Sequence, residues 1–505
     1  MKPLIVLAFD LGASGGRAII GKVDPDVKKL EIEEVYRFPN GPIRVREHLY
    51  WDVLRIWSEV KEGISIAYRK YGEQILSIGV DTWGVDFALL DSNGELVGLP
   101  YCYRDPRRSQ AMRELLSIIP PEKIYMRTGI QFMPINPLYQ LYAMVREKSS
   151  LLQAARTLFM MPDLFNYWLS GVVVSEYTDA STTQFLDPWT KKWALDLLEE
   201  IGLSTNIFPE IIEPGTELGK IDPRLAEELK VKKDIEIIAP ATHDTASAVV
   251  ATPLDEDSAY ISCGTWGLVG VELNEPLVNK KAMEYNFTNE GGAFNTIRFL
   301  KNVQSMWFMQ EIRRALAKRG QEYDYTELTK LAERSKGFIG FIDPDDPRFL
   351  APFDMIEEIM KFLEETGQEK PKNIGELVRL VLESLALKYR LVIEKIEELT
   401  GKKIKKINIV GGGSRNWVHN QLVADFTNRL VEAGPEEATS IGNILMQLAG
   451  LRYVKSLREI REYVRNSFKV KQYQPNHTSK HEDAYSKFIS ILKKTGSLAG
   501  WALKF

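Results

Sequence analysis

The stretch LAFDLGASGGRAIIGKV, residues 7–23, decides how this chain begins to fold. An apolar run ends at Asp10, glycines cluster at 12, 15 and 16, and the residues after Gly16 are short, apolar and partly β-branched. Asp24, Pro25 and Asp26 then interrupt the apolar run, as a turn would. The pattern predicts a strand, a tight glycine turn and a return strand.

The residues after the glycines exclude two common phosphate-binding loops. The dinucleotide fingerprint and the Walker A loop both lead into a helix, and Walker A also needs a lysine before Ser or Thr. Here a strand comes next, and no lysine occurs between Leu4 and Gly21. In such a hairpin the N–H groups of Ala13 to Gly16 can converge on an anion, and Asp10 can hold a metal through water. The alternative is an ordinary hairpin whose glycines only satisfy turn geometry.

Length and composition indicate a globular protein of two domains. The 505 residues exceed what one core usually supports, and 44% hydrophobic and 27% charged residues are globular values. The net charge of -4 without a dense basic stripe argues against a nucleic-acid partner, and no apolar run reaches membrane length. The two cysteines lie far apart and fit a reducing cytoplasm, where we expect the protein. A small-molecule ligand is therefore expected.

Strand-like and helix-like runs alternate along the chain, which is typical of an α/β fold. Residues Ile374–Leu399 keep helical spacing and Gly401 follows as a stop, while Ser479–Lys494 predicts a terminal amphipathic helix. The predicted strands are Leu4–Asp10, Ala18–Val23, Ile75–Val80, Phe87–Asp91, Ile235–Ile238, Ser258–Ser262, Leu268–Leu273 and Ile407–Val410.

The first hairpin has a weak echo near the middle of the chain. AYISCGTWGLVGVEL, residues 259–273, repeats the order strand, glycine turn, strand. PATHDTASAVVATP, residues 240–253, comes just before it and is predicted to cross between the two halves. Two related hairpins suggest duplicated domains that face a common cleft. A chance likeness between two β-hairpins is the alternative.

Two segments carry acidic residues where chemistry could occur. In THDTASAVV, residues 242–250, Thr242 or Asp244 can cap a helix, which the residues alone slightly favour. Asp244 could instead take a proton from a substrate hydroxyl. In VDTWGVDFALLD, residues 80–91, Trp83 either fills the core or forms a platform for a sugar whose hydroxyls bind Asp81, Asp86 and the Gly84 backbone.

A third segment is rich in glycine. IVGGGSRN, residues 409–416, places three glycines directly after a predicted strand. Without Cβ atoms, this backbone would let a planar ring approach closely. A purely structural turn from strand to helix would need similar residues.

In this order along the chain, these segments resemble the FGGY family of carbohydrate kinases, and the resemblance covers nearly the whole chain. The pairing of DTWGVDF with HDTASAV is its most diagnostic feature. The matching segments are DLGASGGR (10–17), IGVDTWGVDFALLD (78–91), GLPYCYRD (98–105), EYTDASTTQ (176–184), THDTASAV (242–249), CGTWGLVG (263–270), NFTNEGG (286–292), LKNVQSMWFMQ (300–310), IVGGGSRN (409–416) and GPEEATSIGN (434–443).

The resemblance implies two actin-like, ribonuclease H-like ATPase domains around a central cleft. The N-terminal domain would span residues 1–250, with the phosphate hairpin and the sugar site. The nucleotide-binding C-terminal domain would span residues 251–455, followed by a helical segment over 456–505.

The resemblance also implies roles for single residues. Asp244 would be the general base, which overturns the preference for a helix cap, and Asp10 would lie near magnesium. The phosphates of ATP would be held by Ala13, Ser14, Gly15, Gly16 and Arg17; the nucleotide would also contact Thr265, Gln310 and, beside adenine, Gly412; the sugar would contact Gly84, His243, Asp244, Thr245 and Asn302.

The activity implied is transfer of a phosphoryl group from ATP, with Mg2+, to the C1 hydroxyl of L-rhamnulose. L-fuculose and D-xylulose are alternative sugars, and a non-catalytic actin-like ATPase module is the alternative outside the enzymes. The segment INPLYQL, residues 135–141, lacks a lysine and a tryptophan that the family often carries there, which leaves the sugar's stereochemistry open. A homodimer is left open as the assembly.

Overall fold

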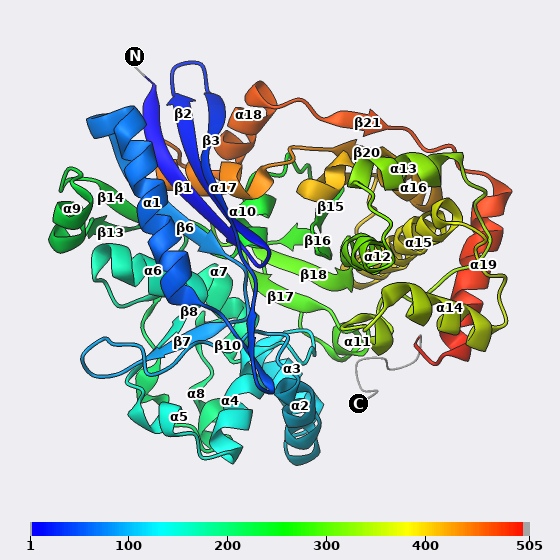
Figure 1. Cartoon of the computed structure of the whole chain (residues 1–505), viewed down its shortest axis with the longest axis horizontal. Helices are drawn as coiled ribbons and strands as arrows, with labels where there is room; N and C mark the ends of the chain where they lie inside the picture. Colours follow the sequence, from blue (N-terminus) through cyan, green and yellow to red (C-terminus); the bar gives the residue numbers. More distant parts are fainter. Residues whose placement is uncertain (1–2, 498–505) are drawn as a thin grey trace.

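The computed structural model describes residues 3–497, in which two large β-sheets have helices between and around them (Figure 1). The first sheet has the spatial order β13 (Thr216–Lys220), β14 (Glu236–Ala239), β6 (Ile75–Thr82), β1 (Leu4–Gly12), β2 (Gly15–Asp24) and β3 (Lys29–Pro39). The second has the order β17 (Thr288–Gly291), β18 (Ile297–Gln304), β16 (Trp266–Leu273), β15 (Ser258–Cys263), β19 (Lys406–Val410), β20 (Leu430–Ala433) and β21 (Lys471–Tyr473).

The two sheets share one plan at their centres. In the first, β1 forms an antiparallel hairpin with β2 and pairs in parallel with β6. In the second, β15 forms an antiparallel hairpin with β16 and pairs in parallel with β19. The echo between the two glycine hairpins therefore reflects a repeated architecture, and the predicted α/β fold is confirmed.

Every strand predicted from the sequence is present, with ends that differ by a few residues. The two predicted helices are α15 (Ile374–Thr400), which stops at Gly401 with φ 68°, and α19 (Ser479–Lys494). The remaining helices are α1 (Val53–Tyr71), α2 (Arg107–Ile118), α3 (Pro121–Thr128), α4 (Pro137–Arg146), α5 (Ser150–Ala154), α6 (Met161–Ser170), α7 (Tyr177–Ala180), α8 (Leu195–Glu200), α9 (Pro223–Leu229), α10 (Asp244–Val250), α11 (Lys280–Glu284), α12 (Trp307–Lys318), α13 (Tyr325–Arg334), α14 (Met355–Thr366), α16 (Trp417–Thr427), α17 (Ala438–Gly450) and α18 (Leu457–Ser467). Short strands outside the two sheets are β4 (Ile43–Val45), β5 (His48–Tyr50), β7 (Phe87–Leu90), β8 (Thr157–Met160), β9 (Ser175–Glu176), β10 (Leu186–Asp187), β11 (Lys192–Trp193) and β12 (Ile211–Ile212).

Two helices, α10 and α17, pack against each other between the sheets (Figure 1). A Cβ atom on Gly442 of α17 would overlap the backbone of Ser247 in α10, so the helices meet at a residue without a side chain. Although α17 lies between β20 and β21 of the second sheet in sequence, it packs on β1 and β6 of the first. There Gln447 Nε2 donates to the Leu7 carbonyl at 3.1 Å, and Asn443 Nδ2 donates to Asp81 Oδ2 at 2.6 Å.

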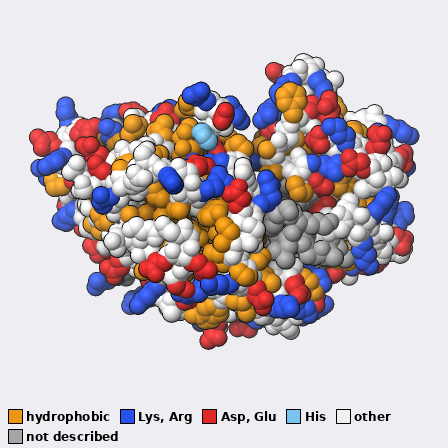
Figure 2. Space-filling view, turned by 90° about the horizontal axis from the view of Figure 1, so that it is seen from below, with side chains coloured by type: hydrophobic (Ala, Val, Ile, Leu, Met, Phe, Trp, Pro, Cys, Tyr) orange, Lys and Arg blue, Asp and Glu red, His pale blue; other side chains and the backbone are white. Residues whose placement is uncertain are grey.

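The surface carries acidic and basic side chains interspersed, with apolar side chains between them, on the face shown in Figure 2. Within the part of the chain that the structure describes, every helix is too short or too polar to cross a lipid bilayer. The space between the two sheets is where residues from both halves of the molecule meet.

Candidate active site

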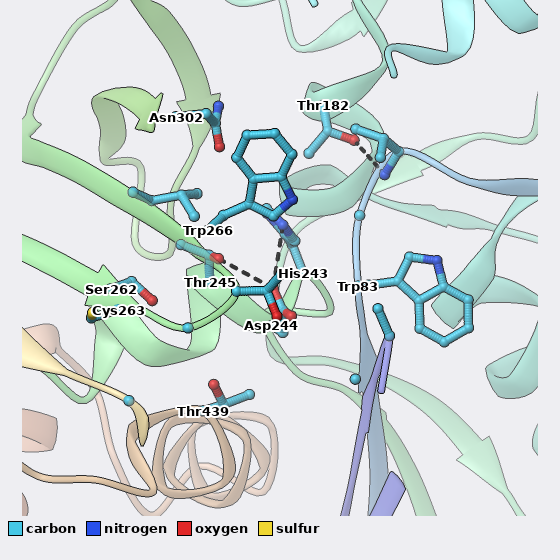
Figure 3. A pocket seen from close by; sticks show the side chains of 18 of the residues that line it. Trp83, Thr182, His243, Asp244, Thr245, Ser262, Cys263, Trp266, Asn302 and Thr439 are labelled. Atoms are coloured by element: carbon cyan, nitrogen blue, oxygen red, sulfur yellow. Dashed lines mark hydrogen bonds and ion pairs between the residues drawn. The ribbon is translucent and has the colours of Figure 1, made fainter. Parts of the chain in front are cut away.

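A cavity of about 460 Å³ lies between the two sheets. His243, Asp244 and Thr245 lie together at its centre, at the start of α10 (Figure 3). The predicted site residues that line it are Asp10, Ala13, Ser14, Arg17, Gly84, His243, Asp244, Thr245, Thr265, Asn302 and Gly412. One cavity thus receives residues from both hairpins, from β18 and from the glycine-rich loop after β19.

Three predicted site residues do not line the cavity. The missing side chains of Gly15 and Gly16 face Phe38 on β3, and a Cβ atom on Gly16 would overlap the Phe38 ring. These two glycines therefore serve the packing of the hairpin on β3. Gln310 lies behind Thr265, to whose Oγ1 its Nε2 donates at 3.2 Å.

Asp244 is the first residue of α10, not its cap. The N-cap position belongs to His243, whose side chain makes no capping hydrogen bond, so the interpretation of Thr242 or Asp244 as the cap is wrong. The Asp244 side chain is 32% exposed, faces the cavity, and accepts a hydrogen bond from Thr245 Oγ1 at 3.2 Å (Figure 3). Burial and the charge of Asp10 raise the pKa of Asp244 to about 7, which suits a group that must accept a proton near neutral pH.

The approach to α10 is fixed by a buried carboxylate. Glu176 Oε2 accepts from both the N–H and the hydroxyl of Thr242, at 3.0 and 2.5 Å, and from Thr178 Oγ1 at 2.5 Å. Thr178 Oγ1 in turn accepts from the His243 N–H at 3.2 Å. A hub that is fully hydrogen-bonded in this way holds the residues before Asp244 in one position.

Acidic side chains gather at the hairpin end of the cavity. Asp10 on β1 stands beside Asp81 on β6 in the parallel register. Burial and the charge of Asp10 raise the pKa of Asp81 well above its usual range, and Asp81 Oδ1 has no hydrogen-bond partner among residues 3–497. Mg2+ in kinases is held by one or two carboxylates together with phosphate oxygens and water, so Asp10, the carboxylate of this pair that lines the cavity, fits that ion.

Arg17 crosses the cleft from the same hairpin. Its guanidinium pairs with Asp10 on its own sheet and with Glu437, which directly precedes α17. Burial alone would lower the pKa of Arg17, but these two carboxylates raise it above its usual value. A permanent positive charge is thereby held where the two halves of the molecule meet.

Asp86 acts one layer behind the cavity. It is fully buried and accepts from Trp51 Nε1 at 2.6 Å, Trp83 Nε1 at 3.1 Å, the Tyr103 N–H at 3.1 Å and Arg108 Nη2 at 2.7 Å. The expectation that Asp81 and Asp86 bind sugar hydroxyls is therefore wrong, because both carboxylates are closed off from the cavity. Trp83 is 4% exposed, so its ring fills the core and still contributes to the cavity wall.

Sequence reasoning missed two cavity residues near Asn302. Gln131 Oε1 accepts from both the N–H and the side-chain amide of Asn302, at 2.9 and 3.1 Å, and thus joins the two halves of the molecule. Glu290 on β17 also lines the cavity. Gln131 stands in a loop with no pattern of its own, whereas Glu290 lies in the NFTNEGG segment, which offered a signal.

Another part of the cavity wall is formed by the loop after β19. Gly411 has φ 81°, which favours glycine, and a Cβ atom on Gly413 would overlap the Cys263 side chain. At Gly412, by contrast, no atom of residues 3–497 beyond its chain neighbours lies within 4 Å of where a Cβ atom would stand. Backbone left open in this way is the kind of surface that a planar base can approach.

Comparisons with known proteins agree with this geometry. The N-terminal domain model of the FGGY family of carbohydrate kinases matches residues 5–251, and the C-terminal domain model matches residues 259–451. A rhamnulokinase from Halalkalibacterium halodurans is 43% identical over 469 residues, covering 92% of this chain and 98% of the relative. A rhamnulokinase from Bacillus subtilis is 39% identical over 473 residues, covering 94% and 96%.

Solved structures show the same fold at low identity. A gluconate kinase from Lactobacillus acidophilus superposes with a TM-score of 0.79 at 18% identity, covering 100% of this chain and 99% of that one. A ligand-bound xylulose kinase from the same organism gives a TM-score of 0.78 at 18% identity, covering 98% of both chains. The fold is thus the two-domain, actin-like α/β fold, and the chain belongs to the FGGY family of carbohydrate kinases.

Proposed function

We propose that this protein transfers the γ-phosphoryl group of ATP to the C1 hydroxyl of L-rhamnulose. The observation that carries the proposal is identity of 37–43% to curated rhamnulokinases, over more than nine-tenths of the chain. The alternative kinases, for L-fuculose or D-xylulose, and the non-catalytic ATPase module are not favoured by this likeness. ATP and the sugar are the two substrates.

In the reaction, Asp244 accepts the proton of the sugar's C1 hydroxyl. The hydroxyl oxygen forms a bond to the γ-phosphorus while the bond from phosphorus to the bridging oxygen of ADP breaks, and the proton leaves later from Asp244 to solvent. A carboxyl pKa of about 7 lets Asp244 be ionised at the start and still hold a proton afterwards. Enclosure between the two halves keeps water from competing with the hydroxyl.

In this proposal the first hairpin binds the negatively charged phosphates of ATP and the magnesium ion. Ala13, Ser14 and Arg17 would face the phosphates, with Gly15 and Gly16 shaping the turn. Asp10 would hold Mg2+. Asp81, which lies behind Asp10, would interact electrostatically with the bound ion. The ion would supply positive charge at the β- and γ-phosphates when bound.

The remaining predicted contacts divide between nucleotide and sugar. Thr265, supported by Gln310, and Gly412 would contact the nucleotide, with Gly412 beside the adenine. Gly84, His243, Thr245 and Asn302 would contact the sugar around Asp244. What supports the division is that Gly84, His243, Thr245 and Asn302 line the same cavity as the proposed base Asp244, while Gly412 offers backbone without a side chain in its wall.

We further propose the N-terminal domain over residues 1–250, the C-terminal domain over 251–455 and a C-terminal segment over 456–505. The strands of the first sheet end before residue 250, which supports the first boundary. In the last segment, β21 pairs with β20 of the second sheet. A homodimer and a cytoplasmic location stay predictions, which light scattering and cell fractionation would test.

The test is ADP release with ATP and magnesium across L-rhamnulose, L-fuculose, D-xylulose, D-fructose and glycerol. We expect L-rhamnulose to give the highest kcat/KM, and preference for another sugar would overturn the substrate assignment. Asp244→Asn should lower kcat by about 10²- to 10⁴-fold with ATP binding retained. Asp234→Asn, an aspartate exposed on the surface, is the matched control and should leave kcat unchanged.

A further inference from the structure

Arg298 on β18 is fully buried and directs its guanidinium across the boundary between the two halves of the molecule. On its own side, Nε donates to the Gly291 carbonyl at 2.7 Å, and Nη1 forms an ion pair with Glu290 Oε2 at 3.1 Å. On the opposite side, Nη2 lies 3.3 Å from the Thr178 carbonyl and 3.1 Å from His243 Nδ1. Arg298 thus lies directly behind the histidine that borders the cavity.

The chemistry of the guanidinium decides which nitrogen of His243 carries the proton. Arginine has N–H donors and no acceptor, so at hydrogen-bond distance the nitrogen that faces Nη2 must accept. Glu290 Oε2 would favour a proton on the same nitrogen, but at 3.8 Å it is farther away than Nη2. His243 Nδ1 is therefore unprotonated, and a neutral ring then carries its hydrogen on Nε2.

The other edge of the ring faces the reaction. His243 Nε2 lies 3.4 Å from Asp244 Oδ1, and a Cβ atom on Gly84 would come within 2.9 Å of it. Burial and the charge of Arg298 lower the pKa of His243 well below its usual range, so the ring stays neutral. A neutral ring with hydrogen on Nε2 can donate toward Asp244 or a sugar hydroxyl without adding a positive charge.

We propose that Arg298 is a positioning residue that fixes His243 in the Nε2–H tautomer and so aims an N–H donor at Asp244 and the sugar. This inference rests on the proposed function only for the identity of that sugar. Arg298 belongs to the second sheet and His243 to the approach of α10 from the first. The donor is therefore set in place only when the two halves are as close as they are here.

The first test needs no mutation at Arg298. Nitrogen-15 NMR of histidine-labelled protein, with the resonance assigned by its loss in His243→Gln, should show Nδ1 unprotonated and Nε2 protonated near pH 7.5. A proton on Nδ1 would overturn the proposal. Because this readout is independent of the sugar, failure of the sugar panel and failure of this inference are distinguishable.

Substitutions then separate Arg298 from its neighbour. Arg298→Gln should lose the single tautomer and lower kcat by about 10- to 100-fold, the size of effect known for residues that orient metal-bound histidines, with the KM for ATP unchanged. Glu290→Gln removes the competing carboxylate and should keep the Nε2–H tautomer. An unchanged tautomer in folded Arg298→Gln, or a switched one in Glu290→Gln, would contradict the assignment. Should Arg298→Gln not fold, the wild-type and Glu290→Gln spectra still decide.

Discussion

The hairpins β1–β2 and β15–β16 have the same backbone plan, but they bring different chemistry to the cavity. The first contributes Asp10 and Arg17, and Asp81 stands beside it on β6. The second contributes Ser262, Thr265 and Trp266, all uncharged. A repeated fold therefore separates two tasks, with charge handled by one copy and neutral contacts made by the other.

The first hairpin carries an electrostatic cost that the second does not. Carboxylates close together in a partly buried site repel one another, which is why the charge of Asp10 raises the pKa of both Asp81 and Asp244. Hydrogen bonds between neutral groups, such as Gln310 to Thr265, contribute only about 0.5–1.5 kcal/mol each and store no such repulsion. Substitutions in the first hairpin should consequently have larger and more varied effects.

The largest expected effect is that of Asp10→Asn. Removing the carboxylate that would hold Mg2+ should lower kcat by at least about 10²-fold, since stabilisation of developing charge by a metal is worth several kcal/mol. When the hairpins are aligned on Gly12 and Gly264, Ser262 takes the place of Asp10. Ser262→Ala should lower kcat by less than about tenfold. Steady-state kinetics over a range of magnesium concentrations measures both. Equal losses in the two variants would break the comparison.

The next largest effect is expected in the stability of glycine-to-alanine variants of the two hairpins. Gly16→Ala would place a methyl group inside the Phe38 ring, and overpacking of this kind costs about 1–3 kcal/mol. At Gly264 the only atom of the described residues, beyond its chain neighbours, within 4 Å of a Cβ atom would be the Trp266 carbonyl oxygen, at 3.9 Å, so Gly264→Ala should stay within about 0.5 kcal/mol of wild type. Calorimetry gives the melting temperatures of both variants. A melting temperature of Gly264→Ala below that of Gly16→Ala would contradict the packing argument.

A smaller effect is expected at Thr265. Thr265→Ala should raise the KM for ATP about fivefold, which corresponds to the loss of roughly 1 kcal/mol of hydrogen bonding, with kcat within a few-fold of wild type. Thr265→Ser keeps the hydroxyl and should behave as wild type. Initial rates at saturating sugar measure the change. A loss confined to kcat would mean that Thr265 stabilises the charge that develops on the phosphates during the reaction. The two hairpins would then not differ in their tasks.

The smallest effect concerns the titration of Asp244 in the magnesium-free protein. Its pKa of about 7 should fall in Asp10→Asn, yet stay above the usual value near 4, because burial is the larger cause. Carbon-13 NMR of the side-chain carboxyl, assigned with Asp244→Asn, measures this directly. Since the folded-state pKa is raised, ionising Asp244 destabilises the fold as pH rises from about 4 to 7, and Asp10→Asn should weaken that dependence. An unchanged pKa would mean that the two carboxylates do not interact.

Sequence patterns predicted most of the central architecture. Apolar runs ending in glycine turns located both hairpins, and helical spacing ending at Gly401 located α15. The strands of the two sheets that were missed are β3, β13, β17, β18, β20 and β21. Two of them have a clear reason, because the edge strand β3 is rich in charged residues and the buried strand β18 includes Arg298 and Lys301. Both charged side chains of β18 are buried and donate to backbone carbonyls, a solution that the sequence pattern does not indicate.

The candidate site was less predictable than the fold. Motif order brought Asp244, Thr265 and Gly412 to one cavity although more than 160 positions separate the first from the last. The supporting residues Asp86, Gln131 and Arg298 have partners distant in sequence, such as Trp51 and Arg108 for Asp86, so their roles depend on packing that single segments do not encode. Asp86 shows the limit plainly, since an aspartate in a polar motif proved to anchor two tryptophans.

The contact of Gly442 with the Ser247 backbone leaves no room for a side chain at the α10–α17 crossing. Even a methyl group at position 442 would overlap the Ser247 carbonyl oxygen, so the two helices would have to separate. Because α10 begins with Asp244 and α17 follows directly after Glu437, which pairs with Arg17, that separation would shift the proposed base relative to the charged hairpin. The spacing of two groups in the cavity thus depends on a single hydrogen atom at a residue that does not line it.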